Sequence, residues 1–141
     1  MIKETYSIGE AAKMFDLSVA TIRYYDQEGL IPNLHKKSGF RRFNKDNLDA
    51  LQMIECLKNA GMSIKDIRQF MEWNVEGDQT LPLRLKMFQQ LRDKIQQQMD
   101  ELQKTLNVAN YKCHYYQQAI DDGTEKYVAQ KKEYVMDLVK K

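Results

Sequence analysis

The chain has 141 residues and a formal net charge of +2, a length that suits one modest domain or one small domain with an elongated helical part. Its two cysteines are too few for a disulfide framework, and no apolar run approaches the roughly 20 residues of a membrane-spanning helix. The chain also opens without a charged-then-apolar signal segment. We therefore expect a cytoplasmic protein with no membrane partner.

Two short helices are predicted at the start. The first covers residues 6–15, where Ser7 and Glu10 form an S-x-x-E capping box. The second has Ser18 as its N-cap and Gly29 as a left-handed stop. Helices joined by so small a turn form a candidate helix-turn-helix, in which the second helix binds DNA. Pairs of short helices are common, so this pattern alone is a weak signal.

A basic segment follows the second helix. Residues 30–45 contain no acid, and Ser38-Gly39 divides them into two short stretches. This pattern predicts a small hairpin, or wing, with exposed positive charge. The alternative is a solvated basic loop, but the position directly after a helix-turn-helix favours a wing that binds neighbouring phosphates. The basic residues are Lys36, Lys37, Arg41, Arg42 and Lys45.

Two further helices complete the first predicted domain, residues 1–74. Asn44 is the N-cap of one and Gly61 ends it, and Ser63 is the N-cap of the next. Four successive helices with the same N-terminal pattern indicate a compact helical domain. Residues 75–79 are polar and are expected to form a hinge.

A long helix is predicted over residues 80–120, with Thr80 as its cap and Pro82 tolerated in the first turn. Its apolar residues recur at alternating steps of four and three for about four heptads, although Arg92 interrupts one position. A helix with one narrow apolar stripe needs a partner, and a second copy of the chain is the simplest one. The alternative is a helix folded back on its own domain. The stripe comprises Leu81, Leu85, Phe88, Ile95, Met99, Leu102, Leu106, Ala109 and Cys113.

Residues 121–141 form a short amphipathic tail, too small to be a separate ligand-binding domain. Only two histidines are present, with no glycine-rich phosphate loop, nucleophile elbow or metal-ligand pair, so we expect no enzyme. A coiled-coil interaction module without sequence-specific DNA binding is the alternative function. The basic wing argues against it.

Five segments spread over about the first 70 residues form one combined pattern. They are Tyr6-Ser7-Ile8-Gly9-Glu10-Ala11-Ala12, Thr21-Ile22-Arg23-Tyr24-Tyr25-Asp26, Glu28-Gly29-Leu30-Ile31, Arg41-Arg42-Phe43 and Leu57-Lys58-Asn59-Ala60-Gly61-Met62-Ser63-Ile64. Together these segments resemble the MerR family of bacterial transcription regulators, and the long helix resembles the antiparallel dimerisation helix of that family. The resemblance implies a mainly α fold: a winged helix-turn-helix domain, a long antiparallel coiled-coil helix and a short C-terminal region.

The family's mechanism is implied only by this resemblance. A homodimer would bind double-stranded promoter DNA at a pseudo-palindromic operator and distort an over-long spacer, so that RNA polymerase engages both promoter elements. Tyr25 is expected to pack against the wing and to be only partly available to phosphate. The residues expected to contact DNA are Ser18, Val19, Ala20, Thr21, Arg23, Tyr24, Tyr25, Lys37, Arg41, Arg42, Lys58 and Ser63.

The effector is less defined than the DNA site. Cys56 matches the position of a cysteine in relatives that respond to aldehydes or other electrophiles, which makes it a candidate sensor in a stress response. The alternative is a small, partly buried core thiol. Cys113 has only His114 beside it, so no metal or other cofactor is expected. A small apolar ligand near Trp73, Tyr111, Tyr115 and Tyr116 is a further alternative.

Overall fold

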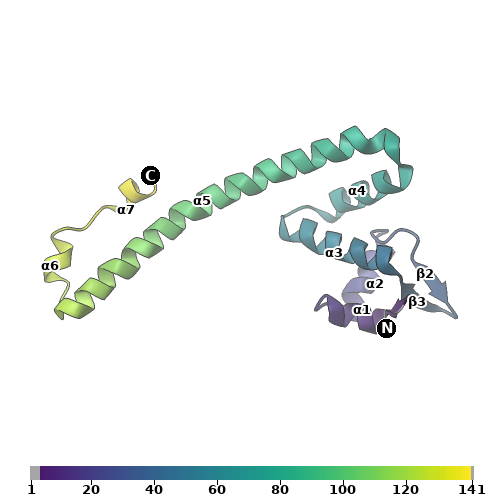
Figure 1. Ribbon diagram of the computed structural model, residues 1–141, viewed down its shortest axis with the longest axis horizontal. Helices are drawn as coiled ribbons and strands as arrows, with labels where there is room; N and C mark the ends of the chain where they lie inside the picture. Colours follow the sequence, from purple (N-terminus) through teal and green to yellow (C-terminus); the bar gives the residue numbers. More distant parts are fainter. Residues whose placement is uncertain (1–3, 141) are drawn as a thin grey trace. The chain divides into compact units, whose positions relative to one another are not determined.

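Helices dominate the computed structural model, which describes residues 4–140 (Figure 1). The predicted mainly α fold, a winged helix-turn-helix followed by a long helix that fits a coiled coil, is confirmed. In chain order the elements are β1 (Tyr6–Ser7), α1 (Ile8–Met14), α2 (Val19–Gln27), β2 (His35–Lys37), β3 (Phe40–Phe43), α3 (Lys45–Asn59), α4 (Ile64–Glu76), a 3-10 turn η1 (Asp78–Thr80), α5 (Leu81–Asp122), α6 (Lys126–Ala129) and α7 (Val135–Leu138).

The chain divides into two compact units, and the boundary falls inside α5. The first unit ends at Phe88 and the second begins at Gln89. The first two turns of α5 therefore belong with the helix-turn-helix. The remainder of α5 forms the second unit together with α6 and α7.

The helix-turn-helix is built by local capping, as predicted. The Ser7 hydroxyl accepts from the Glu10 amide at 3.1 Å, and the Glu10 carboxylate accepts from the Ser7 amide at 3.0 Å. At the start of α2, the Ser18 hydroxyl accepts from the Thr21 amide at 3.0 Å. Gly29, which follows the C-cap, has φ of +76°, a left-handed conformation that glycine adopts without strain.

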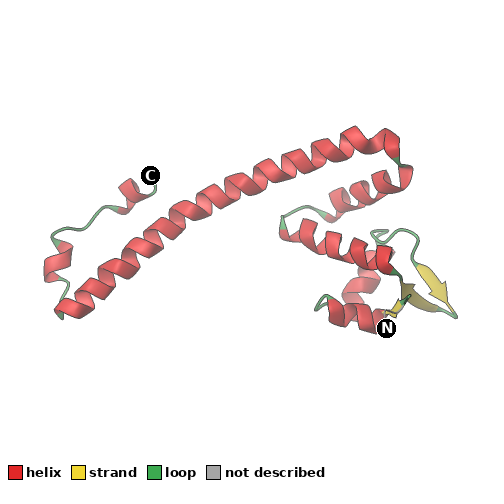
Figure 2. Cartoon of the chain, viewed as in Figure 1, coloured by secondary structure: helices red, strands yellow, loops and turns green. Residues whose placement is uncertain are grey.

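A three-stranded sheet with the order β1-β3-β2 carries the wing (Figure 2). Strands β2 and β3 pair antiparallel around the turn Ser38-Gly39, where both residues have positive φ. The first helix was predicted to begin at Tyr6, but residues 6 and 7 form β1 and pair with Phe43 and Arg42. This strand exists only through a partner far along the chain, and a local capping signal does not reveal it.

The core of the first unit lies among α1, α2, β3, α3 and α4. Aromatic and aliphatic side chains from these elements exclude water and fix the helix-turn-helix against the wing. The largest side chains that are almost fully buried are Tyr25, Phe43, Ile22, Leu30, Leu51, Ile54, Leu57 and Ile67.

The segment between α4 and α5 contains a glycine corner and a short helical turn. Helix α4 includes Val75 and Glu76 and has Gly77, with φ of +97°, as its C-cap. Residues 78–80 then form the 3-10 turn that leads directly into α5. The predicted hinge, residues 75–79, overlaps these elements, and its role as a hinge stays a prediction.

In the second unit, the tail is anchored to α5 by two tyrosines. The Tyr115 hydroxyl donates to the Glu125 carboxylate at 3.0 Å, and the Tyr111 hydroxyl accepts from the Glu133 amide at 2.7 Å. Leu138 of α7 is buried. In contrast, Leu102 and Leu106 of the predicted apolar stripe are exposed in the single chain. Within residues 4–140, no helix combines the length and hydropathy that crossing a membrane requires.

Candidate nucleic-acid interface

The first half of α2 presents the predicted DNA-facing side chains to solvent. Arg23 and Tyr24 are exposed, whereas Ile22 on the opposite face is fully buried. Ser18 and Ala20 are exposed, and Val19 and Thr21 are half-buried. The Thr21 hydroxyl also shares a 2.7 Å hydrogen bond with the Ser18 hydroxyl, which fixes the first turn. We call α2 the recognition helix from here on.

The second half of the recognition helix is instead fastened to the rest of the unit, beginning at Tyr25. Its side chain is only 1% exposed. Its hydroxyl donates to Glu55 at 2.8 Å and accepts from the Lys58 ammonium at 2.6 Å. The ammonium also lies 5.1 Å from the centre of the Tyr25 ring, a cation–π distance. Tyr25 thus faces α3, and Lys58 is the exposed member of the pair.

The pKa values of Tyr25 and Lys58 are both raised. Burial raises the pKa of the Tyr25 phenol, as does the hydrogen bond to Glu55, while the Lys58 ammonium acts in the opposite direction. The hydrogen bond to Tyr25 raises the pKa of Lys58. The lysine therefore stays positively charged at neutral pH, as a phosphate ligand must.

The wing is fastened to the recognition helix through Asp26. Arg41 of β3 donates its Nε hydrogen to the Asp26 carboxylate at 2.8 Å, and both side chains are only 20% exposed. Arg42 donates to Thr5, through Nε to the hydroxyl at 3.2 Å and through Nη2 to the carbonyl at 3.3 Å. The two arginines predicted to bind phosphate therefore also hold the wing in place.

The outer part of the wing carries the freely exposed charge. Lys36 and Lys37 lie on β2 with their side chains in solvent. Phe40, which pairs with Lys37 across the turn, is 74% exposed. A basic hairpin with an exposed aromatic at its tip can contact both phosphate and the apolar faces of nucleotides.

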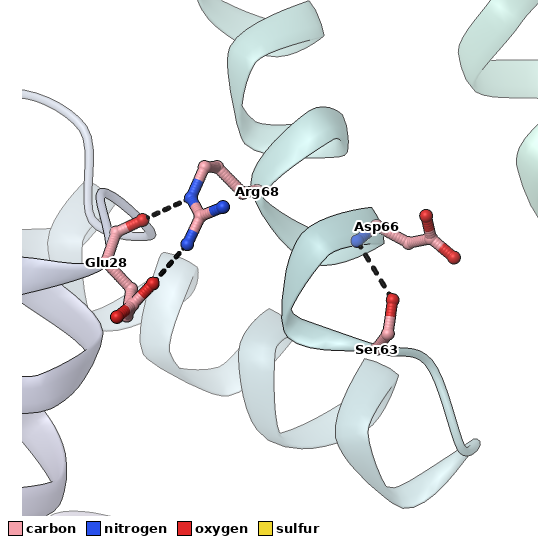
Figure 3. Close-up of polar contacts among 4 residues, drawn as sticks. All are labelled: Glu28, Ser63, Asp66 and Arg68. Carbon is pink, nitrogen blue, oxygen red and sulfur yellow. Dashed lines mark hydrogen bonds and ion pairs between the residues drawn. The ribbon is translucent and has the colours of Figure 1, made fainter.

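Ser63 stands at the predicted second wing. Its hydroxyl caps α4 by accepting from the Asp66 amide at 3.1 Å (Figure 3). Ser63 itself is exposed. The amides of this first turn point outward along the helix axis, an arrangement that suits a phosphate group.

A third fastening joins α4 to the C-terminal end of the recognition helix. Arg68 donates from Nε to the backbone carbonyl of Glu28 at 2.6 Å, and its Nη2 group forms an ion pair with the Glu28 carboxylate (Figure 3). One guanidinium therefore satisfies both a helix-end carbonyl and a side chain. Sequence reasoning missed this pair, because residues 40 positions apart carry no local signal of contact.

Three contacts thus hold the recognition helix from three directions: Tyr25 to α3, Asp26 to β3 and Glu28 to α4. We call them the three fastenings. Each pairs a residue in the last turn of the helix, or its C-cap Glu28, with a cation from another element. The predicted DNA-facing residues of α2, the wing, α3 and α4 all belong to the first unit.

The candidate sensor Cys56 lies on α3 between Glu55 and Leu57, and its side chain is exposed. The Gln52 side-chain amide donates to its sulfur at 3.7 Å. An exposed thiol is available to a reagent, in contrast to the predicted alternative of a core position. Cys113 is also exposed, on the part of α5 in the second unit.

These regions of the chain also match known protein families. Residues 6–73 match the family described as MerR HTH family regulatory protein, and residues 48–108 match the family described as MerR, DNA binding. A protein of Haemophilus influenzae named as an uncharacterized HTH-type transcriptional regulator is 40% identical over 125 residues, which cover 88% of this chain and 93% of that protein.

Two crystal structures are also similar. One is HiNmlR, described as a MerR family regulator lacking the sensor domain, bound to promoter DNA. It is 40% identical with a TM-score of 0.77, and the match covers 86% of this chain and 98% of that one. The other is a MerR family transcriptional regulator from Bacillus thuringiensis, 42% identical with a TM-score of 0.71, covering 78% of this chain and 97% of that one.

Proposed function

The chain belongs to the MerR family of helix-turn-helix transcriptional regulators, and from this premise we propose that it binds a pseudo-palindromic promoter operator as a homodimer. It is a DNA-binding regulator of transcription and not an enzyme. The dimer would place two recognition helices in successive major grooves. The exposed apolar residues of α5 would form the contact between the two copies.

One observation supports this proposal above the others. The three fastenings hold the recognition helix at its C-terminal end, while Arg23 and Tyr24 are exposed, and one of the three fastenings joins this helix to the basic wing. A helix held at its C-terminal end, with exposed side chains on its outer face, is preorganised for a groove. The likeness to a regulator bound to promoter DNA supports the same role.

Salt-dependent binding tests the proposal. We expect the full chain to bind the promoter region of its own gene more tightly than an unrelated duplex of equal length. The logarithm of the affinity should fall linearly with the logarithm of salt, by about 0.9 for each phosphate contacted. Equal affinity for both duplexes would contradict sequence-specific regulation and favour an interaction module.

Activation would proceed by distortion of the promoter. The dimer would bend and underwind an over-long spacer, so that RNA polymerase engages both promoter elements. In transcription with purified polymerase, the regulator should stimulate the natural promoter. It should give no stimulation on a promoter whose spacer has been shortened to the usual length. Equal stimulation of both promoters would exclude this mechanism.

A small effector or electrophile would control the dimer, and Cys56 is the residue that we propose as the sensor. Its exposed thiol lies on the same helix as Glu55 and Lys58, the two partners of Tyr25. A covalent group added at Cys56 would therefore form beside the fastening between α3 and the recognition helix. Such a group can change the position of Lys58 without touching DNA.

A further inference from the structure

The corner between α4 and α5 contains a hydrogen-bond network that the sequence did not predict. Helix α4 ends at Gly77, whose φ of +97° lies in the region that residues with a side chain rarely adopt. The chain then turns through residues 78–80 into α5. Gly77 therefore allows the chain to change direction sharply, and other groups must fix the angle between α4 and α5.

Thr80 is the centre of this network. It is only 2% exposed, and its hydroxyl lies 2.7 Å from the carbonyls of both Trp73 and Gly77. The single hydroxyl hydrogen is thus shared between the last full turn of α4 and the corner itself. The Gly77 amide also donates to the Trp73 carbonyl, at 3.1 Å.

Arg84 completes the network from the first turns of α5. Its Nε donates to the Thr80 hydroxyl, its Nη1 to the Asn74 side-chain oxygen and its Nη2 to the Gly77 carbonyl, each at 3.0 Å. One planar guanidinium therefore joins α5 to the end of α4, to the corner and to the 3-10 turn. A lysine offers a single point of attachment and cannot reproduce this set.

A ring contact supports the same geometry one turn further along α5. Phe88 lies edge-on to Phe70 of α4, with 5.1 Å between the ring centres and 77° between the planes. Both residues belong to the first unit. The start of α5 is thus attached to the DNA-binding unit by polar contacts at Arg84 and by an aromatic contact at Phe88.

We propose that Arg84 is a positioning residue that determines which spacing of operator half-sites the dimer accepts. This inference rests on the proposed function. In a dimer joined through α5, the angle at which α5 leaves each DNA-binding unit contributes to the distance between the two recognition helices. Successive base pairs are only about 3.4 Å apart along the duplex, so a small change of this angle alters the match to the operator.

The experiment measures affinity as a function of half-site spacing. The operator is first located by footprinting on the chain's own promoter region. Duplexes are then made with one or two base pairs inserted or deleted at its centre. The full-length wild-type dimer should prefer one spacing. The Arg84→Ala dimer should still bind, but the ratio between its affinities for the preferred and altered spacings should be roughly fivefold smaller.

Two further variants separate positioning from folding. Asn74→Ala removes one acceptor of Arg84 at an exposed position, so this variant should fold. Its spacing profile, the dependence of affinity on half-site spacing, should also become flatter than that of wild type, but less so than for Arg84→Ala. Lys94→Ala, which removes an exposed cation of α5 outside the apolar stripe, is the matched control and should leave the profile unchanged.

The outcomes are distinct. A wild-type spacing profile in both Arg84→Ala and Asn74→Ala would overturn the role of Arg84. A uniform loss of affinity at every spacing, with the ratios unchanged, would also overturn it, because a merely structural residue has that effect. Failure of the wild-type dimer to prefer its own promoter over unrelated DNA would instead contradict the proposed function itself.

Discussion

The side chain of Arg68 bonds to both the backbone carbonyl and the carboxylate of Glu28, and so joins α4 to the last turn of the recognition helix. Both side chains are about one-third exposed, so solvent weakens the ionic part of the contact. The bond to the carbonyl remains important, because the end of a helix leaves its last carbonyls without partners.

Arg68→Ala should lower the free energy of unfolding by about 1–2 kcal/mol, since both bonds to Glu28 are lost. Glu28→Gln should have a smaller effect because the backbone carbonyl is kept. Urea unfolding of the full chain measures both. Lys65→Ala, at an exposed position of α4, is the control. An equal effect of Glu28→Gln and Arg68→Ala would show that the carbonyl bond contributes nothing.

Arg23 and Arg41 should behave differently, although both are predicted to contact phosphate. Arg23 is exposed, so Arg23→Ala should weaken DNA binding on all sequences, reduce the salt slope by about 1 and leave the melting temperature unchanged. Arg41→Ala should also lower the melting temperature, because it removes the contact with Asp26. Fluorescence anisotropy across a salt series and thermal unfolding distinguish the two. Unchanged DNA binding by Arg23→Ala would remove this residue from the interface.

Tyr25 should make the fold sensitive to alkali. Because burial raises its pKa, the folded state keeps the phenol proton to a higher pH than the unfolded state does. The resulting stabilisation is complete below the ordinary tyrosine pKa of about 10 and is lost as the pH rises through the folded-state value. The raised pKa of Lys58 acts in the same direction.

The corresponding measurement is the melting temperature between about pH 8 and pH 10.5, on either side of the ordinary tyrosine pKa. The melting temperature of the wild-type protein should fall further over this interval than that of Tyr25→Phe, which has no phenol to ionise at this position. Tyr116→Phe, at an exposed tyrosine, should behave as wild type. If the melting temperature of Tyr25→Phe falls as far as that of wild type, the Tyr25 phenol makes no contribution to the alkaline sensitivity.

Cys56→Ser should abolish the transcriptional response to an electrophile while leaving DNA binding intact, because the hydroxyl replaces the thiol without removing the side chain. A reporter fused to the chain's own promoter, in cells exposed to methylglyoxal, measures the response. Cys113→Ser is the matched control, since that thiol is exposed as well. A response that survives Cys56→Ser would show that Cys56 is structural.

The dimer contact along α5 should depend on the apolar stripe. Leu102 is 68% exposed in the single chain, and Leu102→Glu would place a charge in the proposed seam. We expect a shift from dimer to monomer in analytical ultracentrifugation, and weaker operator binding as a consequence. Gln103→Glu introduces the same charge at the neighbouring position and should leave the dimer intact. A dimer that persists in Leu102→Glu would place the contact elsewhere.

The parts of the fold that were predictable depend on residues close together in sequence. Ser18 and Thr21 lie within one turn, as do Ser63 and Asp66, so the helix starts were evident from the sequence. The turn at Ser38-Gly39 is equally local.

The parts that were missed depend on distant partners. Strand β1 requires Arg42 and Phe43, and the fastening at Asp26 requires Arg41. Nothing near Asp26 in the sequence distinguishes it from a solvated acid. Arg84 presents the same difficulty, because an arginine in an amphipathic helix shows no sign of the three acceptors that surround it in the fold.

The three fastenings all lie in the last part of the recognition helix, at Tyr25, Asp26 and Glu28, and this has an evolutionary consequence. Residues 18–21 make no comparable bond to another element among the contacts described. Substitutions at the exposed Ala20 and Arg23, which take no part in the cap formed by Ser18 and Thr21, can change which operator is preferred while the anchored half preserves the fold. A gene duplicate could therefore acquire a new set of promoters through a few changes in one turn of helix.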